Sequence, residues 1–159
     1  MDAKNKKTGR KFPPGAGPVF CCRVHGPKFA IAAMRVTLAE VATEEAFEKM
    51  FRGQNRLSDG LEAVLKKHGV PWSLTRSGAR CEMQFMPTLP KNGTEAKNNF
   101  DWQLMYYTHI YLSNRGILIT PFHNMMLISP VTSDEDIDRL IKTWDDCIAE
   151  LVEISKENV

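Results

Sequence analysis

Long hydrophobic runs are missing from this sequence. No stretch of about 18 consecutive apolar residues, the minimum for a membrane-spanning helix, occurs in its 159 residues. The first residues are also too charged and too rich in proline and glycine to hold the apolar core of a signal peptide. We therefore expect no membrane partner and a cytoplasmic location. With 43% hydrophobic and 25% charged residues, the chain has the composition of a globular domain with one core.

Cysteine is scarce, and its spacing argues against a metal site. Cys21, Cys22 and His25 lie close together, but adjacent cysteines rarely ligate one tetrahedral metal, and no fourth ligand follows. Cys81 and Cys147 lie in apolar stretches, which is typical of small buried side chains rather than reactive thiols. We expect no metal and no disulfide framework.

Charge is unevenly distributed along the chain, although the net charge is only +2. Residues 1–28 contain seven lysines or arginines and a single acidic residue, so the remainder is mildly acidic. Proline and glycine are frequent in the same basic segment, which predicts a solvated arm over residues 1–25 and a globular domain over 26–159. Nucleic-acid binding is not expected, because the aromatic residues between 102 and 111 lack interleaved basic residues and fit core packing better.

Two helices are predicted in the first half of the chain. Residues 28–41 are apolar on nearly every side, which predicts a helix packed on more than one side. Thr43 precedes an acidic first turn and an apolar stripe that continues to a basic last turn before Gly69, so a second helix is expected there. Gly60 lies inside this second helix, where it indicates a close approach of another helix.

The second half of the chain alternates between strand and helix patterns. Apolar and polar residues alternate over 71–86, which predicts two strands joined at Ser77-Gly78. Further elements are predicted as a helix over 94–112, strands over 117–120 and 125–128, and a final helix capped by Ser133 or Thr132. The expected fold class is α+β, with a small and mostly antiparallel sheet covered by helices.

The segment from Tyr111 to Ile141 resembles a known family. It contains Asn114-Arg115-Gly116-Ile117-Leu118, a short loop, an apolar strand, Ser129-Pro130, Thr132 and Asp136-Ile137-Asp138-Arg139. This order is similar to the C-terminal end of the class III pyridoxal-phosphate aminotransferases, the group that includes glutamate-1-semialdehyde aminomutase. Residues 26–34 and 72–85 look like altered versions of earlier segments of that region. The resemblance implies the C-terminal domain of a fold-type I aminotransferase over residues 26–156.

The resemblance also sets an expectation about chemistry. Transamination requires a lysine that forms a Schiff base, an acidic group on the pyridine nitrogen and a phosphate-binding loop. In the family, these groups come from a large domain that precedes the segment similar to residues 26–34. Residues 1–25 show no such pattern around Lys4, Lys6, Lys7 or Lys11. We therefore expect no catalytic residues, no cofactor-binding residues and no bound pyridoxal phosphate for this chain alone, and predict that the isolated chain is inactive.

Four residues are candidates for a substrate-facing loop. In the family, the loop at His123 and Asn124 approaches the substrate, so an imidazole or amide there could meet a substrate carboxylate. Both side chains could instead satisfy backbone groups of the loop. Arg76 and Arg80 bracket the expected turn and could bind a carboxylate, or could be solvated charges at strand ends. Glu82 is expected to face solvent or a neighbouring strand, without a catalytic role.

Three functional interpretations follow. The first is a C-terminal domain of a class III transaminase or aminomutase that functions only as part of a larger enzyme. The second is a free-standing module that associates with itself, or with a full-length aminotransferase, through the apolar helix 28–41. The third is a small binder of carboxylate ligands that uses His123 and Arg76.

Overall fold

The computed structural model describes residues 20–98, 100–120 and 123–157, and the side chains of those between 28 and 156. These residues fall into two compact units that meet between Thr43 and Glu44, and each unit is described by itself. None of the helices within the described ranges combines the length and the apolar character needed to cross a membrane.

The first unit is helical. Helix α1 (Phe20–Val36) continues into a π-helical turn, η1 (Thr37–Val41), which ends where the amide of Ala42 donates to the carbonyl of Thr37 at 2.8 Å. This helix includes the predicted range 28–41 but begins earlier, so residues 20–25 of the predicted irregular arm are helical; the rest of the arm lies outside the described residues.

The apolar side chains of the first unit are exposed. Phe29 and Leu38 are 60% and 64% exposed, and every other residue from 28 to 41 is exposed as well. Residues 20–43 contain no other helix or strand that could cover this surface. The expectation that this helix is packed on more than one side is therefore wrong within the described chain.

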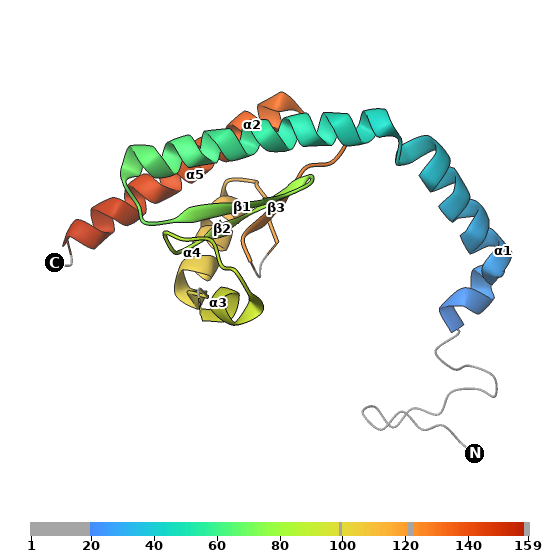
Figure 1. Ribbon diagram of the computed structural model, residues 1–159, viewed down its shortest axis with the longest axis horizontal. Coiled ribbons are helices and arrows are strands. Elements are labelled where there is room, and N and C mark those ends of the chain that lie inside the picture. The colour runs from blue at the N-terminus through green and yellow to red at the C-terminus, as the bar shows by residue number, and fades with distance from the viewer. Residues whose placement is uncertain (1–19, 99, 121–122, 158–159) are drawn as a thin grey trace, which may run out of the picture. The chain divides into compact units, whose positions relative to one another are not determined.

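The second unit is built on two long helices. Helices α2 (Glu44–His68) and α5 (Asp134–Glu157) lie side by side and run in the same direction (Figure 1). Each has acidic residues in its first turn and at least one basic residue in its last turn, which matches the helix dipole.

A capping box begins α5. The hydroxyl of Ser133 accepts from the amide of Asp136 at 3.1 Å, and the carboxylate of Asp136 accepts from the amide of Ser133 at 3.1 Å. The hydroxyl of Thr132 accepts from the amide of Ser129 instead, at 3.0 Å. Of the two predicted caps, Ser133 is therefore the one that is used.

Three antiparallel strands form the sheet in the order β1 (Ser73–Ser77), β2 (Arg80–Gln84) and β3 (Met125–Leu127). Strands β1 and β2 form a hairpin in which Ser77 pairs with Arg80 across Gly78-Ala79. Gly78 has a φ of +59°, a conformation that glycine adopts without the strain of a Cβ atom. The predicted α+β class and hairpin are confirmed.

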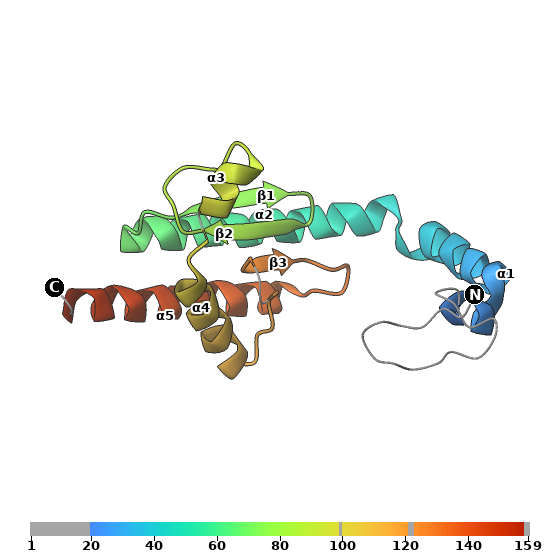
Figure 2. The same cartoon turned by 90° about the horizontal axis from the view of Figure 1, so that it is seen from below.

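Two predictions about the connecting segments are wrong. The expected strand 117–120 is not formed in the described part of the chain, although the amide of Thr120 donates to the carbonyl of Met125 at 3.3 Å. The expected helix 94–112 is divided into α3 (Gly93–Asn98) and α4 (Trp102–Asn114). Figure 2 shows α4 crossing α5, with which it is in contact.

Side-chain caps explain the division of that helix. The carboxylate of Asp101 accepts from the amide of Leu104 at 3.0 Å, and Asp101 has an extended backbone conformation that interrupts helical bonding. The side-chain carboxamide of Asn92 likewise caps α3. Its oxygen accepts a hydrogen bond from the backbone amide of Glu95 at 3.0 Å. Each short helix therefore has its own start signal, which the apolar pattern alone did not reveal.

The core lies between the two long helices and one face of the sheet. Its largest fully buried apolar side chains are Leu57, Leu61, Leu112, Met126, Ile137, Trp144 and Ile148.

Two glycines of α2 allow the close approach of α5. A Cβ atom at Gly60 would overlap the side chain of Ile141, and one at Gly53 would lie 3.2 Å from Ile137. The close helix contact predicted at Gly60 is confirmed.

Gly60→Ala tests this contact. Although alanine favours a helix by about 1 kcal/mol, the added methyl group must displace Ile141, and overpacking of this kind costs about 1–3 kcal/mol. We expect a net loss in the free energy of unfolding, measured by urea denaturation. Gly93→Ala is the control, because a Cβ atom at Gly93 meets nothing within 4 Å. Equal stability of the two variants would contradict the packing described for α2 and α5.

Ion pairs also join α2 to α5. Nη2 of Arg56 lies 2.8 Å from Oδ2 of Asp138, with both side chains largely exposed. Farther along, Asp145 pairs with Nζ of Lys67 at 2.7 Å and with Nε2 of His68 at 2.6 Å. The hydrogen bond from Lys67, followed by that from His68, holds the pKa of Asp145 below its usual range.

A pH dependence follows from Asp145. Because its pKa is lower in the folded chain, its contribution to stability is present above the pKa of the unfolded chain and is lost as the pH falls through the folded value. Asp145→Asn should therefore lower the free energy of unfolding by about 1 kcal/mol at pH 7, and this difference should shrink below about pH 4. Asp146→Asn, which affects only an exposed pair with Lys142, should cost less at pH 7. A difference that stays constant with pH would contradict the assignment.

Candidate functional site

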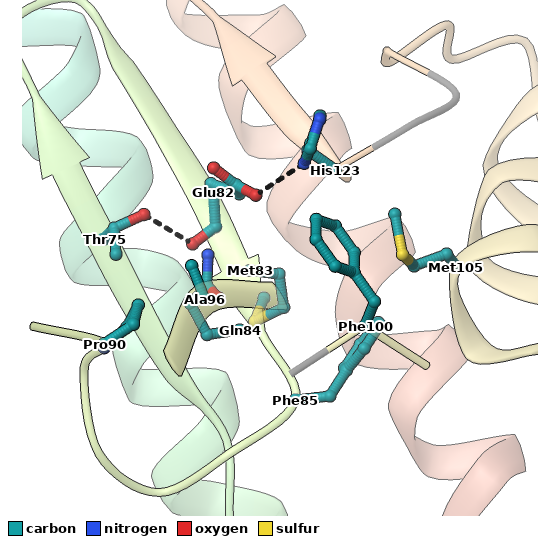
Figure 3. A pocket seen from close by; sticks show the side chains of 10 residues that line it. All are labelled: Thr75, Glu82, Met83, Gln84, Phe85, Pro90, Ala96, Phe100, Met105 and His123. Carbon is teal, nitrogen blue, oxygen red and sulfur yellow. Dashed lines mark hydrogen bonds and ion pairs between the residues drawn. The ribbon is translucent and has the colours of Figure 1, made fainter. Parts of the chain in front are cut away.

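The second face of the sheet carries the candidate site. Side chains alternate along β1 and β2, so Leu74, Cys81 and Met83 enter the core while Thr75 and Glu82, which pair across the strands, lie on the other face. On that face a partly open cavity of about 280 Å³ is lined by side chains from the strands, α3, α4 and the segments between them (Figure 3). Its lining consists of Thr75, Glu82, Met83, Gln84, Phe85, Pro90, Ala96, Phe100, Met105 and His123.

A carboxylate and an imidazole meet in this cavity. Oε1 of Glu82 lies 3.4 Å from Nδ1 of His123, and Figure 3 shows the two side chains pointing toward each other. The side chain of Glu82 is only 29% exposed. Its desolvation raises the pKa of the carboxyl above the usual range, while the nearby His123 opposes the rise. The pair can accept, hold or exchange a proton, and its carboxylate can attract a cation.

Phe100 forms the aromatic wall beside the pair. Its ring centroid lies 5.2 Å from that of His123 and 5.7 Å from that of Trp102, on which it stacks. Trp102 and Tyr106 are 53% and 57% exposed, so the prediction that the aromatic cluster is core packing is wrong for these two. It is confirmed for Tyr111, which is buried.

The structure separates the four predicted site residues. His123 lines the cavity, and Arg80 lies with Glu82 and His123 along an adjoining, more open hollow of about 420 Å³. Arg76 is on the core face of the sheet, where Asp59 and Glu62 of α2 bind its guanidinium at 2.8 and 2.7 Å. The fold therefore brings His123 and Arg80 together and places Arg76 elsewhere.

Asn124 does not line the cavity, and its side chain is buried in the fold instead. It is buried, adopts a φ of +46° and accepts a hydrogen bond from the hydroxyl of Thr108 at 3.2 Å. Asparagine is among the few residues that tolerate this left-handed conformation. Asn124 thus shapes the turn that presents its neighbour His123.

Glu82 is the site residue that sequence reasoning missed. Alternation along β2 does place it opposite the core residues Cys81 and Met83. Its partner could not be read from the pattern, because Glu82 meets His123 only through the pairing of β2 with Met125 of β3, far along the chain. The interpretation of Glu82 as a residue facing solvent or a neighbouring strand is therefore incomplete.

The described residues do not assemble a metal site. Within them, no group of three or more histidine, cysteine, aspartate or glutamate side chains is placed to hold a metal ion. The side chains of Cys21, Cys22 and His25 lie outside the described residues. Cys81 and Cys147 are buried free thiols, as predicted, and burial raises the pKa of Cys147 to about 12.

This arrangement of sheet and helices is that of the C-terminal domain of an aminotransferase. Over 77% of this chain, it superposes on 27% of a glutamate-1-semialdehyde aminomutase from Pseudomonas aeruginosa PAO1, with a TM-score of 0.76 and 44% identity. A β-phenylalanine aminotransferase from Variovorax paradoxus shares the fold, with a TM-score of 0.63 and 23% identity over 77% of this chain and 28% of its own.

Sequence relatives agree with the structural match. The chain is 33% identical over 129 residues to glutamate-1-semialdehyde 2,1-aminomutase 2 of Brevibacillus brevis, a match that covers 80% of this chain and 30% of the relative. No family model matches the chain. The resemblance is confirmed: this chain is similar to the C-terminal part of the class III aminotransferases. It spans about a third or less of the length of the relatives.

The electrostatics of Glu82 can be measured directly. Because desolvation raises its pKa, an NMR titration of the side-chain carboxyl carbon should place the pKa of Glu82 above the usual range for glutamate. His123→Ala should raise the pKa of Glu82 further, since His123 favours the ionised form. A pKa of Glu82 within the usual range for glutamate, unchanged by His123→Ala, would refute the description of the pair.

Proposed function

We propose that this chain supplies the C-terminal domain of a class III aminotransferase or aminomutase and performs no transamination by itself. The observation that supports the proposal is the 44% identity to an aminomutase over a fold that makes up only 27% of that protein. The chemistry of such an enzyme depends on a lysine that forms a Schiff base with pyridoxal phosphate. A cytoplasmic location is part of the same proposal.

The residues that line the cavity support the proposal that this chain performs no transamination by itself. A Schiff-base site needs a lysine amine, and no residue that lines the cavity on the second face of the sheet is a lysine. Glu82, His123 and Arg80 are groups that position and polarise a ligand rather than groups that hold the cofactor covalently. We therefore assign this face a supporting role, which would be fulfilled in a longer enzyme.

Reduction with borohydride tests the proposal. The whole chain is incubated with pyridoxal phosphate, reduced, digested and mapped by mass spectrometry. We expect only sparse labelling spread over exposed lysines, equal to that of a chain unfolded in urea as the control. A stoichiometric adduct at one lysine of the folded chain, with an aldimine absorbance band that urea removes, would contradict the proposal.

A second candidate function is self-association through residues 28–41. The observation that favours it is the exposure of Ile31, Met34 and Leu38 at 63%, 59% and 64%, because a soluble chain rarely leaves so many large apolar side chains uncovered in one short helix. A second copy, or a full-length aminotransferase, is the proposed partner.

Ala32→Glu tests self-association through residues 28–41. A buried carboxylate without a partner strongly destabilises an interface, so we expect the variant to remain monomeric in sedimentation velocity at concentrations where the original chain forms dimers. Ala63→Glu, at an exposed position of α2, is the matched control and should leave the dimer unchanged. A monomer at every concentration of the original chain, or a dimer that Ala32→Glu does not weaken, would remove this candidate.

A further inference from the structure

Asn92 precedes a glycine at an exposed turn of the chain. No other asparagine in the sequence is followed by glycine. Asn92 and Gly93 are both exposed, and a Cβ atom at Gly93 would meet nothing within 4 Å. Because Gly93 has no side chain, its backbone nitrogen can approach the side-chain carbonyl carbon of Asn92 without steric hindrance. Solvent water has access to the same atoms.

The hydrogen bonds at this turn prepare the carboxamide of Asn92 for attack. Helix α3 begins at Gly93, and the first amides of a helix have no acceptor within it. Oδ1 of Asn92 accepts a hydrogen bond from the amide of Glu95 at 3.0 Å. This bond draws electron density away from Cγ and stabilises the negative charge that develops on Oδ1 when a nucleophile adds there.

We propose that Asn92 is a site of spontaneous deamidation. The nitrogen of Gly93 forms a bond to Cγ of Asn92, and the bond from Cγ to Nδ2 breaks. The proton of the Gly93 amide ends on Nδ2, which leaves as ammonia, and a five-membered succinimide remains. Water then opens this ring at Cγ to give aspartate, or at the backbone carbonyl carbon to give isoaspartate. The reaction consumes one water molecule, releases one ammonia, and involves no oxidant, reductant or cofactor.

Both products weaken the start of α3. In the original chain Nδ2 of Asn92 donates to Oε1 of Glu95 at 2.7 Å, so the new carboxylate replaces an attraction by a repulsion between like charges. Isoaspartate has a larger effect, because its main chain runs through Cγ and is longer by one carbon atom. The carbonyl that accepts from the amide of Ala96 at 3.0 Å then becomes part of a side carboxylate. Since Ala96 lines the cavity on the second face of the sheet, the modification loosens the cover of that cavity.

This modification goes beyond the proposed aminotransferase role. It requires neither pyridoxal phosphate nor a longer enzyme, because every reacting group belongs to the turn itself and to water. It can therefore be measured on the whole chain alone, and its failure would leave the assignment of the C-terminal domain untouched.

Incubation of the whole chain in mildly alkaline buffer tests the site. Peptides are mapped by mass spectrometry with electron-transfer fragmentation, which separates aspartate from isoaspartate, and a sample taken before incubation corrects for conversion during digestion. We expect Asn92 to convert at least about tenfold faster than Asn55 and Asn114, which are also exposed but precede arginines. Isoaspartate should be among the products.

Two variants assign the reaction to the proposed atoms. Gly93→Ala places a methyl group beside the attacking nitrogen, at a position where the fold has room for it, and should slow conversion of Asn92 by about tenfold or more. Asn92→Ser keeps a side-chain oxygen that can cap α3 but has no carboxamide, so this peptide should show no mass change. After incubation, hydrogen exchange over residues 93–98 should become faster in the original chain and stay unchanged in Asn92→Ser.

Three results would overturn the proposal. Conversion of Asn92 no faster than that of Asn55 and Asn114 would remove the site. Undiminished conversion in Gly93→Ala would exclude attack by the nitrogen of residue 93. Unchanged hydrogen exchange over residues 93–98 in the converted chain would contradict the loosening of α3.

Discussion

The close contact between α2 and α5 is the constraint on which the second unit depends. Gly53 and Gly60 remove side chains where Ile137 and Ile141 of α5 approach, so two parallel helices become one continuous layer. Large apolar residues from both helices are then fully buried, Leu57 and Trp144 among them. Since the sheet has only three short strands, this layer supplies the surface on which the sheet can bury one face.

The same constraint determines where a site can form. One face of the sheet is occupied by the helix layer, and Arg76 on that face is held by acidic residues of α2. The opposite face is only partly covered, by α3 and by the side chains of Phe100 and His123, so polar residues such as Glu82 remain beside open space there. Core and cavity are thus two consequences of the alternation of side chains along β2.

The long elements could be predicted from the sequence because their signals are local. Helix α2 combines an acidic start, an apolar stripe and a glycine stop, and the hairpin combines alternation with Gly78 in its turn. The helix expected over 94–112 was divided, because its apolar pattern continues across the cap at Asp101. Exposure of the helix at 28–41 could not be foreseen, since apolar composition indicates burial without naming the surface that covers it.

The candidate site could be predicted only in part. His123 was found through its position in the loop of a known family, and Arg80 through the turn that it borders. Arg76 was misplaced, because two residues close in sequence on paired strands can lie on opposite faces of a sheet. Glu82 and Phe100 join His123 through contacts between distant segments, and no local pattern in the sequence carries that information.

Hydrogen exchange of the whole chain, resolved by residue, tests the central role of the two-helix layer most directly. If α2 and α5 form one cooperative unit with the sheet, amides near Leu57, Leu61, Trp144 and Ile148 should open with the same free energy, equal to that of global unfolding. Gly60→Ala should lower all of these values together. Independent opening of α2 and α5, with different free energies and different responses to Gly60→Ala, would contradict the account.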